Sequence, residues 1–154
     1  MELERVRFNY LTLVLYILVD VLKLKGRIDM VRMAVLTSLL QDDSIVELLE
    51  EEDSLSFANI RVLNKSLLAS INRRFYHTLP LLVNASSILM DAGFMTIQEG
   101  DMIIINETGK LAFNKLSGVD SFTARRIDKV LPKMISICDL VTTKRMIKDL
   151  NIEI

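Results

Sequence analysis

The sequence predicts a mainly α-helical protein with one small antiparallel β-hairpin. Three observations lead to this fold class. Only two prolines and five glycines interrupt the 154 residues, which favours long helices. Apolar residues make up 51% of the chain and charged residues 25%, a balance typical of a folded domain rather than a disordered one. One stretch, residues 94–106, changes from helical to alternating periodicity.

The first third of the chain is predicted to form three helices. The first runs from about Asn9 to Lys25 and ends at Gly26. It is apolar on nearly all sides, which places it at the centre of the core. The second covers about Asp29 to Gln41, and Asp42 to Ser44 cap a short third helix. The acidic run Glu50 to Asp53 is unfavourable at a helix C-terminus, so we expect a solvated loop there rather than a metal site.

The middle of the chain is predicted to combine a long helix with the hairpin. The helix covers about Asn72 to Ala92, and Pro80 should kink it or start a new helix. Two five-residue strands, Phe94 to Gln98 and Met102 to Asn106, then flank a three-residue glycine turn. We expect this two-stranded hairpin to be the only β-structure in the protein.

The order of elements around the hairpin is that of a winged helix. A helix, a glycine and a short hairpin are followed by a helix start at Thr108 to Lys110, and this helix reaches about Leu116. The last helix is predicted from about Thr123 to Leu150, with a bend near Pro132. The chain thus divides into an N-terminal helical part (1–53), a winged-helix-like part (54–122) and a C-terminal helix (123–154), within one compact domain.

Charge and cysteine content restrict the environment of the protein. Residues 1–53 hold six basic and eleven acidic residues, whereas residues 107–154 hold nine basic and six acidic ones, so the two ends should face different neighbours. The charged start of the chain, Met1 to Arg5, lacks a secretory pattern, and the apolar run Tyr10 to Leu24 is too short to span a bilayer. We therefore expect a cytoplasmic protein with no membrane partner.

Residues suited to catalysis are few. His77, the only histidine, lies among aromatic residues, where a partly buried structural role is the more common one. Cys138, the only cysteine, lies in an apolar run that indicates a buried thiol. There is no glycine-rich phosphate loop and no metal-ligand spacing. We therefore predict no catalytic, cofactor-binding or metal-binding residue, and we keep a small enzyme that uses His77 only as a rival hypothesis.

Direct DNA reading is also disfavoured. The helix before the hairpin, Leu81 to Asp91, contains no lysine or arginine, and the hairpin tip carries Glu99 and Asp101, which phosphates would repel. Basic residues lie elsewhere. They form either a solvated surface or a set of contacts to the DNA backbone, and they are Arg73, Arg74, Arg125, Arg126, Lys129 and Lys133.

Four segments of the sequence resemble a known family. They are residues 7–11 (RFNYL), 27–36 (RIDMVRMAVL), 73–80 (RRFYHTLP) and 89–94 (LMDAGF), the last followed by the hairpin. Their order is similar to that in the middle components of three-component ABC systems, a group that includes Lamassu-type bacterial defence systems. The resemblance covers most of residues 7–116 and rests on apolar pattern and order.

The resemblance implies a non-catalytic adaptor subunit. Such a subunit associates with an SMC/Rad50-like ATPase and with an effector, such as a nuclease, in defence against phage or plasmids, so DNA would be met weakly or through the partners. We expect part of the apolar first and second helices to be exposed for a partner or a second copy. The expected interface residues are Leu11, Leu15, Leu18, Met30 and Met33. The alternative is a winged-helix transcriptional regulator that binds DNA.

Overall fold

The computed structural model describes residues 2–51, 65–115, 122–150 and 152, and its side chains from Tyr10 onward within these ranges except those of residues 65–68, 122 and 123. It is mostly helical, with a small three-stranded antiparallel sheet. The helices are α1 (Glu2–Lys25), α2 (Met30–Leu40), α3 (Asp43–Glu51), α5 (Lys65–Asp91), α6 (Glu107–Asn114), α7 (Phe122–Asp139) and α8 (Thr143–Asp149). The strands are β1 (Arg27–Asp29), β2 (Met95–Gln98) and β3 (Met102–Ile105).

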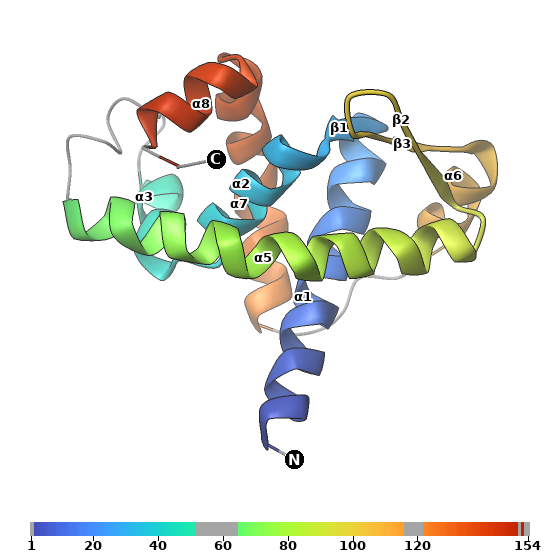
Figure 1. Ribbon diagram of the computed structural model, residues 1–154, viewed down its shortest axis with the longest axis horizontal. Helices are drawn as coiled ribbons and strands as arrows, with labels where there is room; N and C mark the ends of the chain where they lie inside the picture. The colour runs from blue at the N-terminus through green and yellow to red at the C-terminus, as the bar shows by residue number, and fades with distance from the viewer. Residues whose placement is uncertain (1, 52–64, 116–121, 151, 153–154) are drawn as a thin grey trace.

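The long helix α5 crosses the front of the molecule in Figure 1 and packs against both α1 and α2. On the other side, α7 contacts α1, α2 and α3. The sheet and α6 lie together at one end of α5, and α3 lies toward the other end (Figure 1). This arrangement leaves one side of α5 without a neighbour in the described part of the chain.

The central helix of the core is α2. Every residue from Met33 to Leu40 is buried, and the two polar ones among them, Thr37 and Ser38, donate hydrogen bonds to the carbonyls of Met33 (2.8 Å) and Ala34 (2.6 Å). We had expected the first helix in this position because it is apolar on nearly every side. That helix does contribute buried residues, but it also exposes Tyr10 and Leu24.

The predicted hairpin is present, but the prediction that it is the only β-structure is wrong. Strands β2 and β3 pair antiparallel, with Ile97 opposite Ile103, and β1 pairs with the other edge of β3. The strand order is β1-β3-β2. Gly26 ends α1 in the left-handed region (φ +78°), and its carbonyl accepts a hydrogen bond from the backbone NH of Ile105. Three residues between two helices carry no periodicity, so only pairing distant in sequence reveals β1.

Other predicted helix boundaries also change. The helix through Pro80 is continuous and begins at Lys65, because a proline only removes one bond of a ladder that packing on α1 and α2 supports. Helix α3 includes Glu50 and Glu51, which were predicted to lie in a loop. The remainder of that acidic run lies outside the described residues.

The predicted C-terminal helix is two helices. Helix α7 ends at Asp139, and α8 begins after Thr142, whose hydroxyl accepts a hydrogen bond from the NH of Arg145. Arg32 of α2 stabilises the break, because its guanidinium donates to the carbonyls of Cys138 and Val141 at the end of α7. A cation at these unpaired carbonyls offsets the negative end of the helix dipole.

Candidate protein-binding groove

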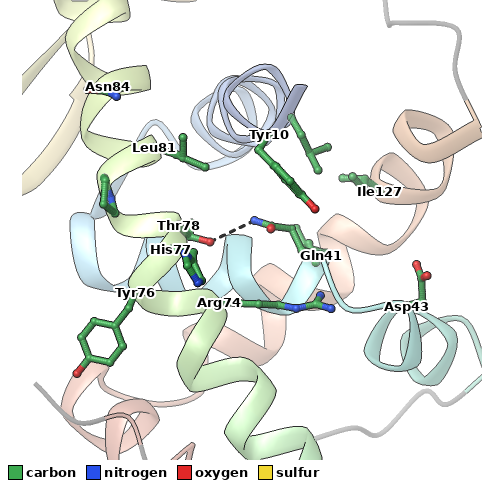
Figure 2. Close-up of a pocket in the computed structure, with 13 residues that line it drawn as sticks. Tyr10, Gln41, Asp43, Arg74, Tyr76, His77, Thr78, Leu81, Asn84 and Ile127 are labelled. Carbon is green, nitrogen blue, oxygen red and sulfur yellow. Dashed lines mark hydrogen bonds between the residues drawn. The ribbon is translucent and has the colours of Figure 1, made fainter. Parts of the chain in front are cut away.

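A groove of about 780 Å³ opens beside α5, between the N-terminal half of α1, the α2–α3 junction and the start of α7 (Figure 2). Its apolar lining comes from four helices and comprises Leu13, Leu40, Pro80, Leu81 and Ile127. Its polar lining comprises Tyr10, Gln41, Asp43, Arg74, Tyr76, His77, Thr78 and Asn84. The groove is therefore mostly uncharged, with one acidic and one basic side chain at its edge.

Hydrogen bonds within the chain hold the wall of the groove. The side-chain amide of Gln41 donates to the hydroxyl of Thr78 at 3.3 Å, as the dashed line in Figure 2 shows. Thr78 is itself buried, so this bond satisfies a polar group that water cannot reach. The contact fixes the end of α2 against the middle of α5. This hydrogen bond is therefore part of the framework, whereas Nη1 of Arg74, also in the lining, is buried without a hydrogen-bond partner in the described part of the chain.

Arg74 also contributes to this wall of the groove. Its Nη1 lies 3.9 Å from Oδ2 of Asp42, whose side chain is almost fully buried. The other carboxylate oxygen of Asp42 accepts from the backbone NH groups of Ser44 (3.0 Å) and Ile45 (3.3 Å), which caps α3 as predicted. Arg74 thus compensates a buried carboxylate. Of the two adjacent arginines that were candidates for DNA contacts, Arg73 is exposed, whereas Arg74 is partly buried.

His77 and Cys138 occupy separate places. His77 is exposed and lines the groove, so the prediction of a partly buried structural histidine is wrong. Cys138 lies near the end of α7, where burial raises the pKa of its thiol to about 12, and it does not line the groove. A thiol that remains protonated and buried is a poor nucleophile. The groove therefore offers His77 no nucleophilic partner of this kind.

Four basic residues of α7 were candidates for DNA-backbone contacts, and two of them, Arg126 and Lys133, contact α3. Arg126 donates from Nε to Glu50 at 2.6 Å, and it also lies 3.6 Å from Asp43 and 4.0 Å from Glu47. These carboxylates raise the pKa of its guanidinium, mainly through the hydrogen bond that Arg126 donates to Glu50. The ammonium group of Lys133 donates to the carbonyl of Leu49 at 2.9 Å. The other two candidates, Arg125 and Lys129, are exposed.

A pair of carboxyl groups joins α1 to α7. The hydroxyl of Tyr16 donates to both oxygens of Asp128, at 2.8 and 2.7 Å. Asp20 lies beside them, and burial, together with the hydrogen bond and the negative charge of Asp128, raises the pKa of Asp20 to about 7. Burial and the hydrogen bond that Tyr16 donates to Asp128 raise the pKa of Tyr16. The proton that Asp20 holds below about pH 7 therefore contributes to the α1–α7 contact.

The interface residues expected from the sequence lie largely inside the chain. Leu18 and Met33 are fully buried, and Leu11, Leu15 and Met30 are partly buried and pack against the core. The side chains of α5 that face outward were not recognised as candidates. Four of its large apolar residues are between 40% and 50% exposed, and they are Tyr76, Val83, Ile88 and Met90.

The described part of the chain contains no group of three or more His, Cys, Asp or Glu side chains that could hold a metal ion. None of the helices described is long and apolar enough to cross a bilayer.

Comparisons with known proteins leave the family open. No family model matches the chain, and no match was found among curated proteins or solved structures.

Proposed function

We propose that this protein is a non-catalytic adaptor subunit that binds a partner protein through the groove. The observation that carries the proposal is the chemistry of this surface. It combines exposed tyrosines and aliphatic side chains with uncharged polar groups, and the hydrogen bond from Gln41 to Thr78 fixes its wall. Such surfaces, rich in tyrosine and low in charge, are typical of protein–protein interfaces.

The resemblance to middle components of three-component ABC systems supplies the identity of the partners. In this proposal the chain links an SMC/Rad50-like ATPase to an effector, such as a nuclease, in a bacterial anti-phage or anti-plasmid system of the Lamassu type. ATP hydrolysis and DNA cleavage belong to those partners. DNA is contacted through the complex, with exposed Arg73 and Lys129 as candidates for weak contacts to the DNA backbone.

The second candidate function is a DNA-binding regulator with a winged-helix-like fold. The order helix–strand–helix–helix–helix–hairpin and the strand order β1-β3-β2 favour such an arrangement. The charges argue against DNA reading, because α5 carries no Lys, Arg, Asp or Glu between Arg74 and Asp91. The exposed hairpin tip also presents Glu99 and Asp101 where a DNA-binding wing would need cations. We therefore propose a winged-helix-like scaffold used for binding protein.

Co-purification with the partners tests the proposal. The chain is co-expressed with the SMC/Rad50-like ATPase encoded in the same gene cluster, and the complex is isolated by affinity and size-exclusion chromatography. Asn84→Arg places a long charged side chain in the groove, and Tyr10→Glu adds a carboxylate at its mouth. Each is expected to weaken the complex at least about tenfold, or about 1.4 kcal/mol. Lys144→Glu on exposed α8 is the matched control and should leave binding unchanged.

Two results would overturn this proposal. One is a gene cluster with no such ATPase, or an ATPase that does not bind. The other is tight, sequence-selective binding of duplex DNA by the isolated chain in a gel-shift titration, which would establish the regulator instead. The adaptor reading expects only non-specific affinity, with a dissociation constant of about 10⁻⁴–10⁻⁶ M at physiological salt.

A further inference from the structure

The outward side of α5 carries a regular seam. Its exposed residues recur at alternating intervals of three and four, the spacing of a coiled-coil contact line. This α5 seam consists of Arg73, Tyr76, Pro80, Val83, Ser87 and Met90. The opposite side of α5 packs on α1, α2 and β2, and the described elements leave the seam uncovered (Figure 1). A long helix is thus apolar on both its inner and its outer side.

The charges at the two ends of the seam are opposite. Arg73 is exposed at the N-terminal end, and Asp91 is exposed directly beyond the C-terminal end, with no Lys, Arg, Asp or Glu from residue 75 to residue 90. Asp91 occupies the last position of α5, where a carboxylate is unfavourable for the helix dipole, and no basic residue lies in that last turn. The chain itself therefore leaves a negative helix end without a nearby cation on the same helix.

We propose that the α5 seam is a self-pairing surface whose occupant is the α5 seam of a second copy of this chain, in antiparallel orientation. An antiparallel register that places Pro80 opposite Val83 also places Tyr76 opposite Ser87. It brings Arg73 of each copy next to Met90 and Asp91 of the other. Each helix end then receives the cation that its own chain lacks. A parallel pair would instead place Arg73 against Arg73 and Asp91 against Asp91, which is repulsive.

The geometry of the seam suits a close but modest contact. The paired segment of 18 residues is about 27 Å long at 1.5 Å per residue. Ser87, Val83 and Pro80 are small enough at its centre for the helix axes to approach within about 8–10 Å. A single helix pair lies at or below the lower end of the area of stable interfaces, about 1,200 Å². The dimer should therefore be in the micromolar range and exchange readily.

This inference goes beyond the proposed adaptor function and does not depend on it. Tyr76 and Pro80 border both the groove and the seam, so the test uses seam residues that do not line the groove. Sedimentation equilibrium of the full chain, at about 1 to about 200 µM, measures self-association in the micromolar range. Val83→Glu and Met90→Glu, at positions 49% and 40% exposed, should weaken the dimer at least about tenfold.

A charge-reversal cycle tests the antiparallel register. Arg73→Asp and Asp91→Arg should each weaken the dimer several-fold, and the double variant should restore it. Leu111→Glu on α6 is the matched control, because Leu111 is 64% exposed but lies outside the seam, and it should leave the dimer intact. Circular dichroism confirms that each variant is folded. A wild-type chain that remains monomeric throughout, a dimer insensitive to Val83→Glu and Met90→Glu, or a double variant that stays weakened would overturn the proposal.

Discussion

The carboxyl pair between α1 and α7 makes a quantitative prediction about pH and stability. The pKa of Asp20 is raised from 3.8 to about 7, first by burial and then by its hydrogen bond to Asp128 and the charge of that residue. The charge of Lys23 and a hydrogen bond with Tyr16 act in the opposite direction and lower the pKa. Because the folded state holds the proton more tightly than the unfolded chain, stability is fully present below the unfolded pKa and is lost as the pH rises through the folded pKa.

The size of the loss follows from the shift. Between about pH 5 and the folded pKa of about 7, Asp20 is protonated in the folded state and ionised in the unfolded chain. This difference extends over roughly two pH units, which corresponds to about 3 kcal/mol without screening. Asp20 is partly exposed and Asp128 is exposed, so solvent screening reduces this to about 1.5 kcal/mol. We therefore expect Asp20 to lower the free energy of unfolding by about 1.5 kcal/mol over this interval.

The variant Asp20→Asn isolates this contribution. An amide keeps a donor for Asp128 and cannot ionise, so the variant should gain about 1.5 kcal/mol over the wild type between about pH 5 and about pH 8. Urea denaturation at both pH values, followed by circular dichroism, measures the difference. Glu107→Gln on exposed α6 is the control and should follow the wild type. An Asp20→Asn variant whose stability changes with pH in parallel with the wild type would refute the reasoning.

Three further predictions concern packing. Arg126→Glu should lower the melting temperature more than Lys129→Glu, because Arg126 contacts carboxylates of α3 whereas Lys129 is exposed; thermal denaturation compares them. Gly109→Ala should cost about 2–3 kcal/mol in urea denaturation, since the new Cβ would lie 2.1 Å from the carbonyl oxygen of Phe94. The neighbouring control Thr108→Ala should cost less than about 0.5 kcal/mol. Reaction of Cys138 with a thiol reagent should require unfolding, because the thiol is buried and its pKa is about 12.

Local sequence signals were sufficient for much of the fold. Asp29 and Asp42 cap α2 and α3, Gly26 and Gly93 end α1 and α5, and the glycine turn joins β2 to β3, all as their residue types predict. Each of these features depends on neighbours within a few residues. The predictions that failed depend on distant partners.

The β1 strand and the break before α8 illustrate this limit. Ile28 forms a strand only because Ile103 lies beside it, and 75 positions separate the two along the chain. The end of α7 is stabilised by Arg32, which lies more than 100 residues away. Neither partner changes the hydrophobic periodicity of the segment whose structure it stabilises. The sequence likewise does not show whether Arg126 pairs with the carboxylates of α3 or is solvated.

The position of the binding surface was mistaken for a related reason. Hydrophobicity alone predicts that a helix apolar on nearly every side is either buried or covered by a partner, and the sequence places this expectation on α1 and α2. The core has room at its centre for one, α2, and it covers the inner sides of α1 and α5. On α5 the apolar side chains that the core does not cover lie outward as a seam at heptad spacing. On α1, Lys23 and Lys25 interrupt the apolar side chains at the exposed end of the helix. An exposed seam without a charged side chain from residue 75 to residue 90, and not total apolarity, is thus the feature that distinguishes a contact surface from a core helix in this chain.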